Sequence, residues 1–198
     1  MFAPLAIAGL FLAVAVTTAT ESKQCQAPPQ WQADGSSPLQ EAQKAGNITV
    51  LAFLDANCGY CVLQATLLQR LKRKLEKKKI KDVTYIILNK KTAKGMKFRL
   101  ESAVDFKVYQ AENGDIWEKL DGRRNDFFIF DKCGRLAYFL DQSASYLGWP
   151  HVRHAILYTY QNKHQCHAMC KAEIHLLQKG DLKTMGKTTK EKRTNDVC

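Results

Sequence analysis

The chain has 198 residues, 45% of them apolar, and a formal net charge of +11. This length and apolar content suit one globular domain with an ordinary core, and they exclude an intrinsically disordered chain.

The N-terminal residues 1–20 carry no charge and end in small residues, a pattern that predicts a secretory signal peptide. Their apolar run, 5–16, is too short to span a bilayer, and no later segment is apolar enough to do so. Seven cysteines suit an oxidising compartment, and an odd number leaves at least one thiol free, paired with another molecule or paired transiently. We therefore expect a secreted, extracellular protein without a membrane span.

A secreted chain of this charge would meet sulfated glycosaminoglycans and anionic cell surfaces before it met nucleic acid, so we expect no nucleic-acid partner.

Residues 21–47 form a polar, proline-containing N-terminal segment with Cys25. The segment ends at Asn47-Ile48-Thr49, a glycosylation sequon that predicts a glycan on Asn47 in a surface loop.

The remaining pattern alternates apolar strands with amphipathic helices. Strands are predicted at 48–54 and 83–88, a hairpin at 127–131 and 136–140, helices at 61–78 and 150–161, weakly helical residues at 90–105, a short edge element at 108–109 and a helical turn at 116–120. This order predicts an α/β thioredoxin-like fold, with a central mixed sheet and helices on both faces. We expect the folded domain to cover 21–178 and the basic tail, 179–198, to be disordered.

The sequence Cys58-Gly59-Tyr60-Cys61 lies between the first strand and the helix that follows it. The positive end of the helix dipole and its unpaired N–H groups favour a thiolate, so Cys58 is predicted to have a lowered pKa and to attack first. Cys61, one turn further, would then close the disulfide. The alternatives are a static structural disulfide and half of a zinc site.

Two positions depart from ordinary thioredoxins. Ala52 stands where they have a buried Asp, and Asp55 is nearer to the dithiol but is expected to be exposed at the strand end. Arg124-Asn125-Asp126 stand where they have a cis-proline. We therefore expect slow peroxide or thiol chemistry with a restricted partner rather than fast general disulfide reduction.

From Cys25 to Cys170 the chain resembles the N-terminal domain of the selenoprotein P family. The resemblance rests on several motifs in the same order: Cys25-Gln26-Ala27-Pro28-Pro29-Gln30-Trp31, the CxxC followed by Leu63-Gln64-Ala65, Asp126-Phe127, and Asp131-Lys132-Cys133-Gly134-Arg135-Leu136. It implies a secreted glycoprotein with a thioredoxin-like domain, associated with selenium transport and homeostasis, antioxidant defence and heparin binding. The family places selenocysteine at the position of Cys58, with Cys61 as its partner.

The chain has Cys at position 58 and shows neither the His-rich stretches nor the selenocysteine-rich region of the family. It therefore resembles a short family member that keeps the redox domain. No cofactor is expected, and selenium would be present only if Cys58 or another Cys position is encoded as selenocysteine. Glutathione or protein thiols are the expected reductants.

The resemblance also implies disulfides near the last helix. A Cys166–Cys170 bridge, or one that reaches Cys198, is expected, with Cys25 and Cys133 as a further pair, although sequence alone leaves the connectivity open. A less favoured alternative is a zinc site made from His164, Cys166, His167 and Cys170.

Two basic stretches are candidates for heparin binding. The first is one-sided in charge and includes Lys72, Arg73, Lys74, Lys77, Lys78 and Lys79. The second, to which the resemblance assigns the family's heparin-binding segment, includes Lys90, Lys91, Lys94, Lys97 and Arg99. The simpler interpretation of the first stretch is a solvated helix face.

Three hypotheses follow. The first is a secreted thiol oxidoreductase or peroxidase-like antioxidant domain that acts through Cys58 and Cys61. The second is a non-catalytic heparin-, glycosaminoglycan- or selenium-binding module with a structural CxxC. The third is a purely structural secreted domain whose Cys58–Cys61 disulfide never opens.

Overall fold

The computed structural model describes residues 23–111, 116–172 and 175. The predicted signal peptide at 1–20, the predicted tail at 179–198 and Cys198 lie outside these residues. Within the described part of the chain, no helix combines the length and the apolar character that crossing a membrane requires.

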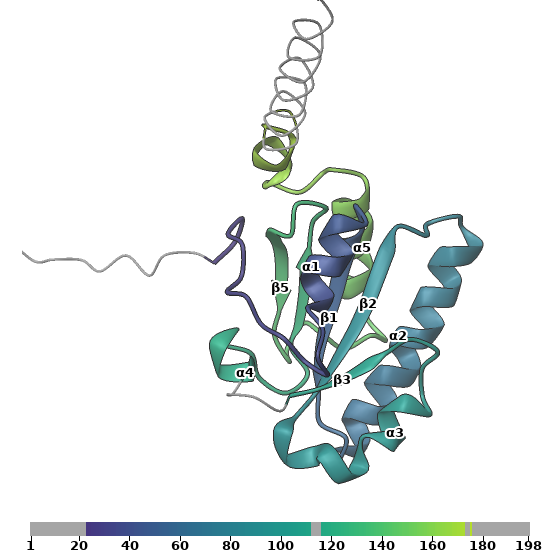
Figure 1. Cartoon of the computed structure of the whole chain (residues 1–198). Helices are drawn as coiled ribbons and strands as arrows, with labels where there is room; N and C mark the ends of the chain where they lie inside the picture. Colours follow the sequence, from purple (N-terminus) through teal and green to yellow (C-terminus); the bar gives the residue numbers. More distant parts are fainter. Residues whose placement is uncertain (1–22, 112–115, 173–174, 176–198) are drawn as a thin grey trace, which may run out of the picture.

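A five-stranded mixed sheet forms the centre of the molecule (Figure 1), with the strand order β3-β2-β1-β4-β5. The strands are β1 (Ile48–Leu54), β2 (Val83–Asn89), β3 (Val108–Gln110), β4 (Phe127–Phe130) and β5 (Leu136–Leu140). The first three are parallel, and β4 and β5 form an antiparallel hairpin that joins the sheet beside β1. The two predicted long strands, the short edge element and the hairpin are confirmed.

Helices cover both faces of the sheet (Figure 1). They are α1 (Pro38–Lys44), α2 (Gly59–Lys77), the 3₁₀ helix η1 (Lys91–Met96), α3 (Phe98–Glu101), α4 (Ile116–Lys119) and α5 (His151–Tyr160). α2, α3 and α5 pack on one face, whereas α1 and α4 pack on the other. The α/β thioredoxin-like fold predicted from the sequence is therefore confirmed.

Strand β1 supplies both cores because successive side chains of a strand point to opposite faces. Val50 and Ala52 pack into the core beneath α2 and α5, while Leu51 and Phe53 pack into the core beneath α1 and α4. Every residue of β1 is buried, which explains why its sequence is a continuous apolar run instead of an alternating one.

Helix α1 was not predicted, since the polar segment 21–47 contains only a few apolar residues. Pro38 starts the helix, at a position where a backbone N–H would have no partner within the helix. Pro38, Leu39 and Ala42 are buried. Three buried positions are enough to hold so short a helix against the sheet.

Two disulfides, Cys25–Cys166 and Cys133–Cys170, tie the N-terminal segment and the residues after α5 to the hairpin. The expected Cys166–Cys170 and Cys25–Cys133 pairs, and the bridge to Cys198, are therefore wrong. The zinc alternative is wrong as well, because Cys166 and Cys170 are both in disulfides. The Cys166–Cys170 expectation treated neighbours in sequence as partners, whereas the fold brings Cys166 to Cys25 and Cys170 to Cys133.

Candidate functional site

Cys58 is the N-cap residue of α2. Its backbone is extended, its N–H donates to the Asp55 carbonyl oxygen at 2.9 Å, and its own carbonyl oxygen accepts from the Val62 N–H at 3.2 Å. The Cys58 thiol therefore lies at the positive end of a 19-residue helix. This is the position that the sequence predicted for the attacking thiol.

The turn that precedes Cys58 is held from two sides. Asn89, fully buried at the end of β2, accepts a hydrogen bond from the Ala56 N–H at 3.0 Å, and the Arg99 guanidinium donates to the Ala56 carbonyl oxygen at 2.7 Å. Sequence reasoning missed Asn89, although a polar residue at the end of an apolar strand was a signal. Arg99 is also a predicted heparin-binding residue, and that assignment stays a prediction; in the structure its side chain is bound to the turn before Cys58.

The two thiols of the motif lie in different environments, and neither is in a disulfide. Partial burial acts to raise the pKa of Cys58. Hydrogen bonds from the Cys61 backbone, the Cys61 thiol and the Tyr60 backbone, together with the charge of Arg124, outweigh burial and lower this pKa from its ordinary value. Cys61 is fully buried, and this burial raises its pKa to about 12.

Asn125 lies against the buried thiol at the position where thioredoxins have a cis-proline. The single proton of the Cys61 thiol has two alternative acceptors, the Cys58 sulfur and Asn125 Oδ1, which lies 3.2 Å from Cys61 Sγ. The Asn125 N–H donates to the Phe53 carbonyl oxygen at 2.8 Å. Asn125 has a φ of 71°, a left-handed conformation that Asn tolerates better than most residues. None of the described residues has a cis peptide bond.

Asp55 is only 7% exposed, so the expectation of an exposed side chain was wrong. Its Oδ1 accepts a hydrogen bond from the Asn57 N–H at 3.0 Å, which holds the carboxylate within the turn. Ala52 is fully buried, as a residue of the central strand must be. Asp126 follows Asn125 in the chain, and burial raises the pKa of its carboxyl group.

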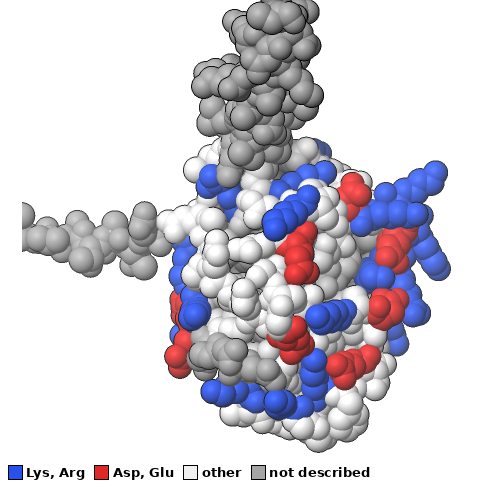
Figure 2. All heavy atoms as spheres, in the orientation of Figure 1, with Lys and Arg blue, Asp and Glu red and all other residues white. Residues whose placement is uncertain are grey.

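The two predicted basic stretches differ in how far their charges are already paired. Lys and Arg side chains gather at the right-hand edge of the molecule in Figure 2, over the C-terminal half of α2. In the first stretch, the exposed residues Lys74, Lys77, Lys78 and Lys79 have no ion pair among those found for the described residues. Lys72 is paired with Glu76 and Asp105.

In the second stretch, Lys97 forms ion pairs with Asp34 and Glu101, and Arg99 is bound to the turn before Cys58. Lys90, Lys91 and Lys94 are exposed, and Lys90 lies over the Trp117 ring at 5.8 Å from its centroid. The first stretch therefore offers the larger unpaired charge.

Asn47 is half-buried just before β1, and its Nδ2 donates to Thr84 Oγ1 at 3.1 Å. A glycan would be attached at this nitrogen and would leave it one N–H to donate. Glycosylation of Asn47 stays a prediction.

Comparison with known proteins identifies the family. Residues 20–197 match the family model described as Selenoprotein P, N terminal region. The chain belongs to the selenoprotein P family. It is 36% identical to Selenoprotein P of Homo sapiens over 149 residues, which cover 72% of this chain and 39% of the human protein. It is 30% identical to Selenoprotein Pb of Danio rerio over 166 residues, 81% of this chain and 62% of the relative. The match thus spans less than two thirds of either relative.

Solved structures with the same fold include a candidate thiol:disulfide interchange protein, DsbE, from Chlorobium tepidum. It superposes with a TM-score of 0.56 at 14% identity, covering 69% of this chain and 97% of that one. An uncharacterized thioredoxin-like protein from Porphyromonas gingivalis gives a TM-score of 0.50 at 17% identity, covering 61% and 80% of the two chains. At these identities the likeness establishes the fold alone.

Proposed function

We propose that this selenoprotein P-like domain is a secreted thiol oxidoreductase with an antioxidant role, and that Cys58 and Cys61 are its catalytic residues. The observation that carries the proposal is the difference in exposure and pKa between the two thiols. A half-exposed thiol with a lowered pKa at a helix N-terminus can attack, and a fully buried thiol with a raised pKa can hold its proton until it is needed.

In the proposed reaction, the Cys58 thiolate attacks one sulfur of a disulfide, forms a mixed disulfide and releases the other sulfur as a thiolate, which takes a proton from solvent. Cys61 then loses its proton, attacks the Cys58 sulfur and releases the second thiol. Two electrons pass from the dithiol to the substrate. Glutathione or another thiol reduces the Cys58–Cys61 disulfide and closes the cycle.

A peroxide could serve as the oxidant through the same residues. Cys58 would take one peroxide oxygen as a sulfenic acid and release an alcohol or water, and Cys61 would then displace that oxygen as water to form the disulfide. If selenium occupies position 58, the steps are unchanged and the attacking group is ionised more completely at neutral pH.

Turnover of 2-hydroxyethyl disulfide and of hydrogen peroxide, with glutathione as reductant, tests this proposal. Both substrates should be consumed faster with the parent protein than with glutathione alone, and Cys58→Ser should abolish this increase in rate. Equal turnover by Cys58→Ser and the parent would exclude the catalytic role. Intact mass spectrometry of protein secreted by transfected cells would report signal cleavage, selenium content and a glycan on Asn47.

A second candidate function is binding of heparin or related glycosaminoglycans. The unpaired lysines of the C-terminal half of α2 favour it, since several cations on one surface attract a polyanion at moderate salt. Exchange of Lys74, Lys77 and Lys78 for Glu should lower the salt concentration needed for elution from heparin. Three equal exchanges at Lys107, Lys119 and Lys163, which are exposed outside this stretch, form the matched control. An equal fall in elution salt for both variants would mean that binding depends only on the net charge of the protein.

A further inference from the structure

An exposed stripe of side chains runs along α2 away from the CxxC motif. Tyr60, Leu63 and Leu67 are spaced by three and four residues, so they share one face of the helix. Tyr60 is 38% and Leu63 is 46% exposed. Leu63 and Leu67 belong to the apolar residues that recur at helical spacing along α2, but the core does not bury them as it buries Leu68 and Leu75.

Aromatic side chains lie beside this stripe. The Tyr60 ring stacks on Tyr146 with their centroids 6.1 Å apart, and Tyr146 packs edge-on against Trp149 at 5.7 Å. Trp149 is 50% exposed, although Trp is usually well covered in a folded domain. These contacts form a continuous apolar path from the residues beside Cys58 to Trp149.

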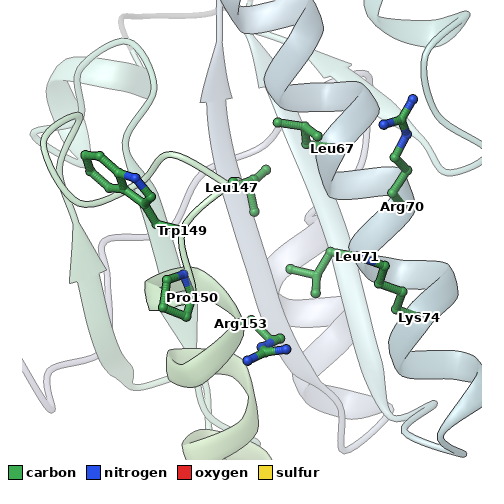
Figure 3. A pocket seen from close by; sticks show the side chains of 9 residues that line it. Leu67, Arg70, Leu71, Lys74, Leu147, Trp149, Pro150 and Arg153 are labelled. Atoms are coloured by element: carbon green, nitrogen blue, oxygen red, sulfur yellow. The ribbon is translucent and has the colours of Figure 1, made fainter.

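The path ends at a cavity of about 370 Å³ between α2 and the segment that leads into α5. Figure 3 shows its apolar residues, with Leu67 and Leu71 on α2 and with Leu147, Trp149 and Pro150 across the gap. We call the path and this cavity together the docking groove. The groove is open to solvent along its length and is not an enclosed tunnel.

Gln64 holds the two walls of the groove in place. Its side chain is fully buried, donates to the Ser145 carbonyl oxygen at 3.0 Å and accepts from the Leu147 N–H at 3.1 Å. These two bonds fix the 145–147 segment against α2. The groove therefore exists before a ligand arrives, which lowers the entropic cost of binding.

Cations line the cavity on both sides. Arg70 and Lys74 project from α2 and Arg153 lies on the first turn of α5, opposite them (Figure 3). All three are exposed, and none forms an ion pair among those found for the described residues. No residue that lines the cavity is acidic. An apolar floor between unpaired cations fits a ligand with an apolar group flanked by negative charges.

We propose that the docking groove binds an extended acidic segment of a partner protein, whose disulfide reacts at Cys58. This inference rests on the proposed redox function and adds its substrate class. A fatty acid fits less well, because it carries one charge at one end and its chain needs an enclosed site. A second copy of this chain fits less well, because its net charge is +11.

The dimensions set the position of the anchor in the partner. Leu67 follows Cys58 by nine residues and Leu71 by thirteen, and at about 1.5 Å per helical residue the cavity lies roughly 14–20 Å from the reacting sulfur. An extended chain covers about 3.3 Å per residue, so the anchoring side chain lies roughly four to six residues from the partner's reacting cysteine.

A labelled peptide tests the proposal by fluorescence anisotropy. It carries Ser at the reacting position and, about five residues away, the sequence Asp-Leu-Asp, and it is made in both chain directions. One of the two directions should bind. Arg70→Glu combined with Arg153→Glu should weaken that binding about tenfold or more, and Trp149→Ala should weaken it about fivefold or more, as loss of an aromatic anchor does.

The matched control is Lys81→Glu combined with Lys163→Glu, which makes the same change of net charge at exposed positions outside the groove. This variant should bind the peptide within about twofold of the parent at physiological salt, where distant charges are screened. A peptide with Lys-Leu-Lys in place of Asp-Leu-Asp should not bind. The proposal would be overturned if the acidic peptide bound in neither chain direction or if the lysine peptide bound equally well. It would also be overturned if the two double variants lost the same amount of peptide affinity. It would also be overturned by a dimer in sedimentation that Trp149→Ala dissolves, or by binding of laurate without binding of the peptide.

Reduction of 2-hydroxyethyl disulfide separates this proposal from the one on which it rests. The molecule is neutral and too small to reach from Cys58 to the cavity, so its turnover reports on the dithiol alone. Turnover without peptide binding would refute the docking groove and leave the redox function intact. Peptide binding without turnover would refute the redox function while the acidic-segment site remained.

Discussion

At the scale of single residues, the two cysteines of the motif differ because one lies at the surface end of a helix and the other lies inside. Cys58 gains hydrogen-bond donors and the charge of Arg124, which lower its pKa. The pKa of Cys61 is raised by burial, which outweighs a hydrogen bond from the Asp55 backbone that acts to lower it. The sequence predicts this division of roles, since a helix that begins at Cys58 places Cys61 one turn further in.

The partner of Cys61 could not have been predicted in the same way. Asn125 is 64 residues away from Cys61, and only the pairing of β4 with β1 brings the two together. The same is true of Asn89, which reaches the Ala56 N–H across 33 residues. A polar residue at the end of an apolar strand marks Asn89 as unusual, but the partner that it binds depends on tertiary structure, which the local pattern does not encode.

The first prediction concerns the ionisation of Cys58. Because the pKa of Cys58 is lowered from the ordinary thiol value of 9.0, its alkylation by iodoacetamide should follow a titration whose midpoint lies below pH 9. Cys61→Ala removes one of the hydrogen bonds that lower this pKa, so the midpoint should move upward. The rate is measured by mass spectrometry of the Cys58 peptide across pH 5–10. A midpoint at or above 9 in the parent would contradict the geometry of the site.

The second prediction concerns the resolving step. With a pKa of about 12, Cys61 is almost entirely protonated at neutral pH, and its thiolate fraction rises about tenfold per pH unit until the pH approaches that value. Release of glutathione from a Cys58–glutathione mixed disulfide should therefore be slow at pH 7 and should accelerate about tenfold per unit between pH 7 and 9. The released thiol can be followed by chromatography.

Cys61→Ser serves as the control for this measurement, because it keeps the mixed disulfide and cannot resolve it. A rate in the parent that does not change between pH 7 and 9 would show that another group removes the proton from Cys61 before the sulfur attacks.

At the scale of elements, the sequence predicted the strands and helices whose positions follow from the local spacing of apolar residues. The apolar runs of β1 and β2, the glycine-containing hairpin and the amphipathic α2 and α5 form within about two residues of the expected bounds. Helix α1 was missed because only three of its seven residues are buried, and a polar sequence with so little apolar pattern resembles a loop. The exposure of Leu63 could not be foreseen, because periodicity does not tell which apolar positions another element will cover.

The third prediction tests a close contact between the segment after α4 and β1. A Cβ on Gly122 would overlap the ring of Phe53, which is fully buried. Gly122→Ala must therefore displace that ring, at a cost of about 1–3 kcal/mol in the free energy of unfolding. Urea denaturation monitored by circular dichroism measures the change.

Gly95→Ala is the matched control for Gly122→Ala. No atom lies within 4 Å of the Cβ it would add, and Gly95 does not have a positive φ. Its free energy of unfolding should be unchanged or slightly increased, because Ala has less backbone freedom to lose on folding. Equal effects of the two substitutions would mean that the Phe53 contact is not tight.

At the scale of the whole molecule, the family and the fold followed from the sequence, but the cysteine pairing did not. Cys25 and Cys166 are 141 residues apart, and Cys133 and Cys170 are 37 apart. The first pair joins the N-terminal segment to the chain after α5, and the second joins that same region to the hairpin turn. Both bridges therefore hold the two ends of the domain to one edge of the sheet, on the β5 side.

The fourth prediction ranks the two bridges by stability. A disulfide restricts the unfolded chain more when it closes a longer loop, which gives roughly 5 kcal/mol for Cys25–Cys166 and roughly 4 kcal/mol for Cys133–Cys170 in the chain-entropy account. Cys25→Ala with Cys166→Ala should thus lower the free energy of unfolding by about 1 kcal/mol more than Cys133→Ala with Cys170→Ala. Urea denaturation under non-reducing conditions provides the comparison, and Cys58→Ser, outside both bridges, should change the free energy by less than about 0.5 kcal/mol. A larger loss from the shorter loop would show that packing at the hairpin, and not chain entropy, sets the contribution of these bridges.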